Sequence, residues 1–201
     1  MAKTEITWDD IVRTAKKLNV EPCALKAVCV VETSGSGFLP SGRPKILFEG
    51  HTFWGKLIKR GINPESYAPE NPDIVYPKWT KQHYKGGERE YERLDRACKI
   101  HEEAALSSAS WGAFQIMGFN YKACGYPSVG AFVDAQKAGS DAQLYAFCAF
   151  IKAKNLVRHL KSKDWALFAE GYNGTGYAAN QYDKKLAAAY EKCRKKEKIE
   201  G

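Results

Sequence analysis

Apolar residues recur at spacings of three and four along most of this chain, which is the period of an amphipathic helix. Residues 44–51 alternate instead, and alternation over so short a run predicts a strand. The chain is therefore expected to be mainly α, in the α+β class, with one small β-hairpin. The predicted helices cover about residues 8–17, 22–32, 53–58, 88–106, 129–137, 144–151, 165–169 and 182–199.

Hydroxyl residues stand before several of these helical stretches, where a side-chain oxygen can accept from a free backbone N–H. The expected N-caps are Thr7, Ser128, Ser140 and Ser162. The serines at 107, 108 and 110 have the composition of a further N-cap.

The helix at residues 22–32 ends on a carboxylate. Pro22 suits a first helical position, and Leu25, Val28 and Glu32 follow at spacings of three and four, so Glu32 continues the apolar stripe. Thr33–Gly37 is typical of a helix end. Burial would raise the pKa of Glu32 and suit it to act as a general acid. The alternative is a structural acid that caps a loop or pairs with an arginine.

A second carboxylate lies in the predicted strand. Alternation places Leu47, Glu49 and His51 on one face, and Ile46 and Phe48 on the other. If the Ile46 and Phe48 face is buried, the polar pair faces the same cleft as the first acid. If it is not, Glu49 is an ordinary solvated strand residue.

Two later stretches carry polar groups among small and aromatic residues. Gln115 stands alone among apolar neighbours, and a buried amide must bond either to the backbone or to a ligand. Residues 170–177 contain three glycines, which predict a loop after the helix, and this loop carries Tyr172 and Asn173. Such a loop could stack on and hydrogen-bond to a sugar, or it could be a plain turn between helices.

Composition narrows the class of protein. The chain has 201 residues, enough for one domain with a sizeable core, and 44% of them are hydrophobic. A net charge of +8 indicates attraction to anionic material such as nucleic acid, an acidic membrane surface or a wall polymer. The basic end, Lys192–Lys198, is expected to be solvated. The first ten residues are polar, so no secretory signal is expected.

The six cysteines are scattered, without a CxxC pair or a histidine at ligand spacing, so no metal site is expected. We expect them to be reduced core residues. They are Cys23, Cys29, Cys98, Cys124, Cys148 and Cys193. Phosphate-loop, nucleophile-elbow and HExxH patterns are absent from the sequence, which disfavours nucleotide, esterase and metalloprotease chemistry.

Three stretches together resemble the lysozyme-like superfamily, in particular goose-type lysozymes and soluble lytic transglycosylases. They are Val31–Gly35, Ser110–Met117 and Gly171–Gly174. Closer still, Glu32 with residues 36–39, 42–44 and 46–51 resembles the N-acetylmuramidase domain of phage endolysins, over about residues 20–193. In this chain Thr33 stands where a serine often follows the catalytic glutamate.

The resemblance implies a lysozyme-like fold and an enzyme that cleaves the β-1,4 bond between N-acetylmuramic acid and N-acetylglucosamine in peptidoglycan. Glu32 would be the general acid and Glu49 the second carboxylate, with no metal or cofactor. The expected substrate-binding residues are His51, Ser110, Gln115, Tyr172 and Asn173.

The resemblance also sets expectations for the protein in the cell. We expect residues 1–201 to form a single catalytic domain without a separate wall-binding module, acting as a monomer. It would be made in the bacterial cytoplasm and act on the wall in the periplasm, with attraction to the anionic envelope and no nucleic-acid partner. The rival functions are a lytic transglycosylase, which forms 1,6-anhydromuramyl ends, and a non-catalytic basic binding module.

Overall fold

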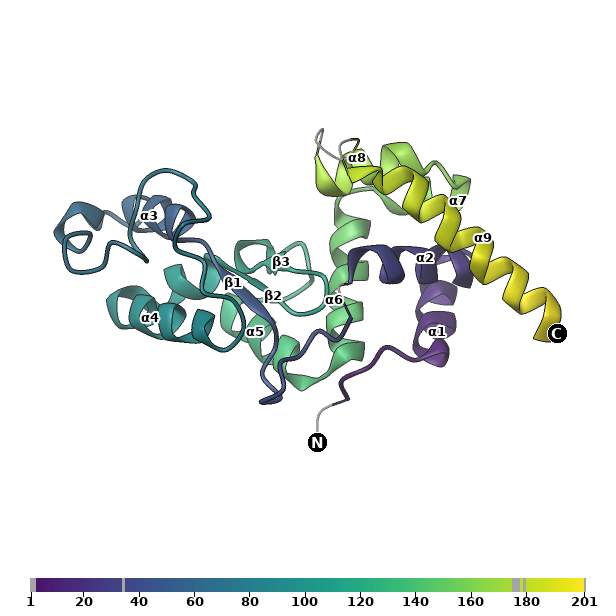
Figure 1. Cartoon of the computed structure of the whole chain (residues 1–201), viewed down its shortest axis with the longest axis horizontal. Coiled ribbons are helices and arrows are strands. Elements are labelled where there is room, and N and C mark those ends of the chain that lie inside the picture. Colours follow the sequence, from purple (N-terminus) through teal and green to yellow (C-terminus); the bar gives the residue numbers. More distant parts are fainter. Residues whose placement is uncertain (1–2, 34, 175–177, 179, 201) are drawn as a thin grey trace.

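The chain folds into helices arranged around a small sheet (Figure 1). The computed structural model describes residues 3–33, 35–174, 178 and 180–200. Figure 1 shows α3 and α4 on one side of the sheet, and α1, α2 and α7 to α9 on the other. The helices are α1 (Trp8–Leu18), α2 (Pro22–Glu32), α3 (Gly50–Ile58), α4 (Arg89–Ser107), α5 (Val129–Ala138), α6 (Ser140–Ala153), α7 (Val157–Ser162), α8 (Trp165–Asn173) and α9 (Tyr182–Glu200). The prediction of a mainly α fold with a small sheet is confirmed.

Three short strands form the antiparallel sheet, in the order β1 (Ile46–Phe48), β2 (Ala109–Trp111) and β3 (Ile116–Met117). Ile46 lies opposite Trp111, and Ser110 lies opposite Met117. Strands from distant parts of the chain therefore meet in one sheet, and the only tight hairpin of named strands within the described residues is β2–β3.

The serine cluster before Trp111 does not cap a helix, so that prediction is wrong. Ser107 ends α4, and the chain then enters β2. The hairpin turn needs left-handed backbone at Gly112, with φ +71°, and at Gln115, with φ +47°. A Cβ at position 112 would lie 2.6 Å from Oε1 of Gln136, so only glycine fits there.

Helix α2 follows its prediction. Pro22 occupies the first helical position, and Leu25 and Val28 are completely buried. The helix stops where Thr33 turns to extended backbone, and the Thr33 hydroxyl donates 2.6 Å to the Cys29 carbonyl. The last residue of the helix, Glu32, is thus fixed at the edge of the core. Ser34 of the predicted helix end lies outside the described residues.

Two of the four predicted N-caps are confirmed. Thr7 forms a capping box with Asp10, and Ser128 accepts from Ala131 N at 3.1 Å. Ser140 instead is the first residue of α6, and its hydroxyl donates to the Glu5 carbonyl at 2.6 Å. Ser162 lies at the end of α7, and Asp164 caps α8 in its place.

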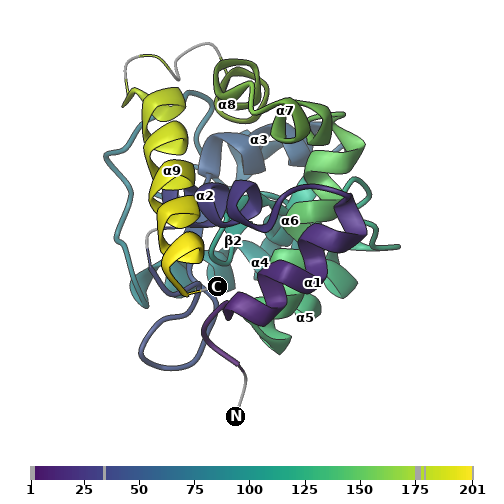
Figure 2. The same cartoon turned by 90° about the vertical axis from the view of Figure 1, so that its right-hand side faces the viewer.

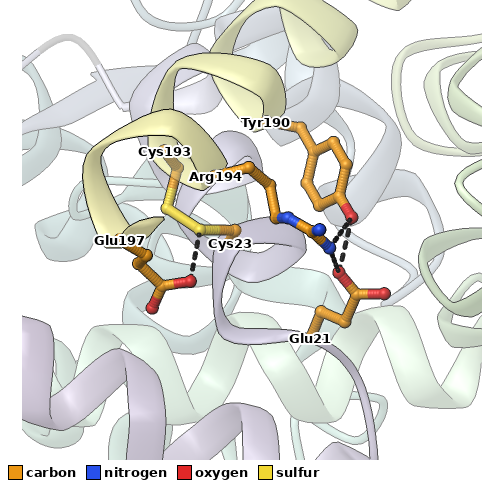
Figure 3. Close-up of a disulfide and its surroundings, with 6 residues drawn as sticks. All are labelled: Glu21, Cys23, Tyr190, Cys193, Arg194 and Glu197. Carbon is orange, nitrogen blue, oxygen red and sulfur yellow. Dashed lines mark hydrogen bonds and ion pairs between the residues drawn. A yellow bond between two sulfur atoms is a disulfide. The ribbon is translucent and has the colours of Figure 1, made fainter. Parts of the chain in front are cut away.

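The prediction that all six cysteines are reduced is wrong for two of them. A disulfide joins Cys23 in α2 to Cys193 in α9, across 170 residues of sequence (Figure 3). Helix α9 runs across α2, as Figure 2 shows. Beside the disulfide, Glu21 accepts hydrogen bonds from Tyr190 at 2.5 Å and from Arg194 at 3.3 Å. Arg194 of the basic end is thus paired with Glu21, the residue directly before α2.

No helix in the described part of the chain is long and apolar enough to cross a membrane. The main hydrophobic core extends through the fold, from Ile11 in α1 to Leu186 in α9. A separate small cluster surrounds the disulfide and contains Ala24, Ala27 and Tyr190.

Candidate active site

The carboxyl group of Glu32 lies half-buried at the C-terminal end of α2. Asn173 donates a hydrogen bond from Nδ2 to Oε1 of Glu32 over 3.1 Å. Burial raises the pKa of Glu32, and the Asn173 hydrogen bond opposes part of that rise because it favours the ionised form. Such a carboxyl group holds its proton to higher pH than an exposed glutamate, which suits proton donation near neutral pH.

Asn173 is the last residue of α8, and the helix is longer than the sequence predicted. Gly171, Tyr172 and Asn173 all belong to the last turn of α8, and the loop begins only at Gly174. The prediction of a loop from residue 170 is therefore wrong at its start, and residues 175–177 of that loop lie outside the described residues.

Tyr172 anchors the end of α8. Its ring packs against Phe147 and Phe168, with centroids 5.5 and 6.0 Å away. Its hydroxyl donates to the Phe114 carbonyl at 3.2 Å. Burial and the charge of Glu32 both raise the pKa of Tyr172, so the hydroxyl remains a neutral donor. Tyr172 therefore joins α8 to the β2–β3 hairpin and places Asn173 beside the acid.

Glu49 directly precedes α3 and does not lie in the strand. Strand β1 ends at Phe48, and α3 begins at Gly50. Position 50 requires glycine because a Cβ there would lie 2.3 Å from the Tyr76 ring. The predicted strand alternation through His51 is wrong, since His51 lies in the first turn of a helix.

Glu49 and His51 nevertheless lie together. Nδ1 of His51 is 3.3 Å from Oε2 of Glu49, a contact that becomes an ion pair when the ring is protonated. The Tyr84 hydroxyl lies 2.8 and 2.9 Å from the two carboxylate oxygens and donates to them. The Glu49 side chain is only 14% exposed. Burial and the neighbouring carboxylate raise the pKa of Tyr84, so its hydroxyl keeps its proton and remains a donor.

A buried ion pair fixes the backbone just before Glu49. Oε2 of Glu90 lies 2.8 Å from Nη1 of Arg93, and both side chains are almost completely buried. Glu90 accepts from the Phe48 N–H at 3.1 Å, and Arg93 donates to the Phe48 carbonyl at 2.9 Å. A buried pair persists when its remaining polar atoms are satisfied, as they are here by backbone groups.

Gln115 and Ser110 bond to each other inside the hairpin. The Ser110 hydroxyl donates to Oε1 of Gln115 at 2.8 Å, and Nε2 of Gln115 donates to the Gly112 and Lys45 carbonyls at 2.8 and 3.3 Å. The sequence left backbone and ligand open as partners for this amide. In the structure Gln115 is exposed instead of buried, and its amide bonds to backbone carbonyls and to Ser110, so contact with a ligand stays a prediction. Ser110 is only 5% exposed, and its hydrogen bond with Gln115 helps to hold the turn.

The hairpin connects the two groups of predicted site residues. On its helical side lie Glu32, Tyr172 and Asn173, linked through Phe114. On its other side β2 pairs with β1, which leads into Glu49. The structure therefore presents the two acids in different settings, with separate partners.

Sequence reasoning missed a second amide at this junction. Gln143, buried in α6, accepts from Ala113 N at 2.9 Å through Oε1 and donates to the Gln136 carbonyl at 2.9 Å through Nε2. It missed Tyr84 and the Glu90–Arg93 pair as well. Their sequence context is helical or irregular, and each of them also bonds a group that lies 30 to 45 residues away.

Within the described residues, no group of three or more His, Cys, Asp or Glu side chains is arranged to hold a metal ion. The four other cysteines are free thiols in the structure, and Cys29, Cys124 and Cys148 are buried. Burial raises the pKa of each of these three thiols, which makes them poor nucleophiles.

Similarity to known proteins identifies the family of this chain. The family profile described as N-acetylmuramidase matches residues 21–194. The crystal structure of a Burkholderia AP3 phage endolysin is similar, with a TM-score of 0.88 and 45% sequence identity. The match covers 96% of this chain and 73% of that endolysin chain. No curated protein matched the sequence. The match over most of its length shows that this chain belongs to the N-acetylmuramidase family.

Proposed function

We propose that this protein is a peptidoglycan hydrolase of the endolysin type that cleaves the β-1,4 bond between N-acetylmuramic acid and N-acetylglucosamine. The observation that carries the proposal is the half-buried Glu32 carboxyl group, whose pKa is raised by burial and which bonds to Asn173. In this role Glu32 protonates the oxygen of the leaving sugar as the bond breaks. The family match and the endolysin neighbour support the same chemistry.

Glu49 is the second carboxylate in this proposal. Its contacts with Tyr84 and His51 favour a carboxylate that is held in one orientation. It acts as nucleophile in a retaining reaction, or as the base that activates water in an inverting one. The anomeric configuration of the first product, followed by NMR on a short oligosaccharide, distinguishes the two. No metal or cofactor takes part, because two carboxylates suffice for glycoside cleavage.

His51, Ser110, Gln115, Tyr172 and Asn173 complete the proposed sugar site in two ways. Asn173 and His51 contact the two carboxyl groups, which supports a role for both in binding the sugar beside them. The other three act indirectly, since Ser110 and Gln115 shape the hairpin turn and Tyr172 holds α8 against it.

Purified cell wall provides the test. Digestion with a hydrolase leaves muropeptides with reducing N-acetylmuramic acid ends, which mass spectrometry detects as a gain of one water for each bond cleaved. A lytic transglycosylase would instead give 1,6-anhydro ends, lighter by that water. Products with reducing ends from the wild type, and none from Glu32→Gln, are expected. Anhydro ends would contradict hydrolysis, and an absence of products would favour a binding module.

The proposal extends to where the protein acts. Action in the periplasm is supported by the Cys23–Cys193 disulfide, since disulfides persist in oxidising compartments. Synthesis in the bacterial cytoplasm is part of the same proposal. A net charge of +8 favours attraction to the anionic envelope. The substrate partner is peptidoglycan. We further propose a monomer in which residues 1–201 act as one catalytic domain, because a single main core joins α1 to α9.

A further inference from the structure

The contact between Tyr84 and Glu49 joins two distant segments of the chain. Glu49 directly follows strand β1, whereas Tyr84 lies in the irregular stretch before α4. The Tyr84 hydroxyl lies 2.8 and 2.9 Å from the two oxygens of the Glu49 carboxylate. The two segments must keep their separation for this contact to persist. The orientation of Glu49 therefore depends on what holds the two backbones together.

One buried carboxylate holds both backbones. Oε2 of Glu90 accepts from the N–H of Phe48, the residue before Glu49, at 3.1 Å. Oε1 of the same group accepts from the two N–H groups that directly follow Tyr84, at 2.6 and 3.0 Å. The Glu90 side chain is completely buried. Since a carboxylate is rigid and planar, the two segments cannot separate without the loss of a charge-assisted hydrogen bond.

Arg93 is the counter-ion of Glu90 and holds a third segment. Nη1 of Arg93 lies 2.8 Å from Oε2 of Glu90 and donates to the Phe48 carbonyl at 2.9 Å. Nη2 and Nε donate to the Asp73 carbonyl at 2.7 and 3.1 Å. The guanidinium group thus connects α4, strand β1 and the loop that contains Asp73.

The backbone on both sides of Glu49 is fixed by groups outside its own segment. Besides the Phe48 N–H, which donates to the buried pair, Glu49 N donates to the Ser108 carbonyl at 2.9 Å. Gly50 N donates to the Tyr76 hydroxyl at 3.2 Å. The Glu49 side chain does not cap the first turn of α3, every residue of which the structure describes, so its carboxylate stays available to the site.

A buried ion pair is weak evidence for stability, because two apolar residues of similar volume are often at least as stable in its place. An apolar pair could not accept from the N–H groups of two segments or donate to the carbonyls of two others. The planar carboxylate and the fork of the guanidinium group fix directions as well as contacts. The Glu90–Arg93 pair therefore serves the geometry around Glu49 more than the stability of the fold.

We propose that Glu90 is a positioning residue for glycoside cleavage, which acts through Tyr84 on the carboxylate of Glu49. The inference rests on the proposed function, in which Glu49 is the second carboxylate. Glu90 is buried and does not meet the substrate. Its two oxygens keep the Tyr84 hydroxyl within hydrogen-bonding distance of Glu49, and Arg93 balances its charge.

Tyr84→Phe tests the last step, since it keeps the ring and removes the donor to Glu49. On a soluble GlcNAc–MurNAc oligosaccharide we expect kcat to fall about tenfold and KM to change less than about twofold, because the bond orients a reacting group and not the sugar. The matched control is Tyr91→Phe on α4, whose hydroxyl donates to the Pro44 carbonyl at 2.9 Å. Equal losses of kcat in the two variants, or none in Tyr84→Phe, would overturn the proposal.

Glu90→Asp tests the action at a distance. It keeps the charge beside Arg93, but its side chain is one methylene shorter, so it cannot reach both segments. We expect kcat to fall about tenfold at nearly unchanged KM, and the double variant with Tyr84→Phe to be no slower than the slower single variant. A further loss of more than about twofold in the double variant would contradict action through Tyr84. Should Glu90→Asp not fold, Glu90→Gln carries the same test.

Loss of a buried carboxylate elsewhere is the control for stability alone. Asp10 is 2% exposed, accepts from Thr7 N at 2.9 Å and pairs with Arg13 at 2.7 Å, all at the start of the chain. Asp10→Asn should lower the melting temperature and leave kcat of the folded protein unchanged. A kcat reduced as much as in Glu90→Asp would make both effects general and overturn the proposal.

Crystal structures of the wild type and of Glu90→Asp supply a readout besides activity. We expect the Tyr84 hydroxyl to move beyond about 3.5 Å from the Glu49 carboxylate in the variant, which ends the hydrogen bond. An intact bond would overturn the coupling. If the wild type leaves cell wall uncleaved while the variant loses the bond, the proposed function fails and the coupling stands. If the wild type cleaves wall and Tyr84→Phe is as fast, the positioning role fails and the proposed function stands.

Discussion

Glu32 and Glu49 are the same kind of residue in two different environments. Glu32 ends a buried helix and has one neutral donor, Asn173, so that burial dominates and raises its pKa. Glu49 is placed by a strand end and contacts the Tyr84 hydroxyl and the His51 ring. Paired carboxyl groups in contrasting environments are how one site holds an acid and a base together. The difference between the two environments supports the proposal that Glu32, on the helical side, donates the proton and that Glu49, on the sheet side, is the second carboxylate.

The assignment of the acid predicts the largest effect. Glu32→Gln should lower kcat by about 10²- to 10⁴-fold, because the amide has nearly the same shape but cannot donate the proton. Release of soluble muropeptides from purified wall measures this rate. Glu170→Gln is a suitable control, since Glu170 is exposed on α8. Substantial hydrolysis by a folded Glu32→Gln protein would refute the assignment.

A comparable or smaller loss is expected at the second acid. Glu49→Gln should lower kcat by about 10²-fold or more, the usual scale for removing one preorganised charged or polar group from a site. The Tyr84 hydroxyl retains an oxygen acceptor, so the local structure should survive. Rates like those of the wild type would move the second role elsewhere, for instance to the loop of residues 71–76.

The disulfide predicts an effect on stability away from either acid. The double variant Cys23→Ser, Cys193→Ser should have a free energy of unfolding about 2 to 5 kcal/mol lower than that of the wild type, because the disulfide closes a very long loop. Urea unfolding of the oxidised proteins measures the difference. Cys98→Ser is the control, as Cys98 is a free, half-buried thiol. A difference below about 0.5 kcal/mol would mean that the contacts of α9 suffice without it.

The smallest expected effect is a gain in stability. A carboxyl group whose pKa is raised by folding favours the folded state below its unfolded pKa and loses that advantage as pH rises through its folded pKa. Glu32→Gln, which carries no charge at any pH, should therefore melt at a higher temperature than the wild type at pH 7. The two proteins should converge at pH values below the ordinary range for glutamate. A gap that widened in acid would contradict the raised pKa.

Local patterns predicted the helical side of the site well. Pro22 at the helix start, the three- and four-residue spacing to Glu32 and the glycines beyond it all concern neighbours along one helix. Thr7 and Ser128 were equally local, and both cap their helices, whereas Ser140 and Ser162, predicted by the same rule, do not. Such signals depend on a few consecutive residues, so a sequence can show them.

The sheet side depended on contacts between distant residues. A strand was predicted over residues 44–51, of which only Ile46–Phe48 forms one. Its partner at Ala109–Trp111 was missed because serines favour helix caps as well as turns. Tyr84 bonds to a residue 35 positions away, and Cys23 pairs with a cysteine 170 positions away. Neither spacing carries a local signal, so only the folded chain shows these partners.

Helix α2 carries the disulfide near one end and the proposed acid at the other. Its 11 residues make a stiff rod about 16 Å long, with Cys23 in its second position and Glu32 in its last. A helix of this length moves as a rigid body, so a cross-link near its N-terminal end also restricts movement of its C-terminal end. The disulfide to α9 therefore helps to keep Glu32 beside Asn173, although it contacts neither residue.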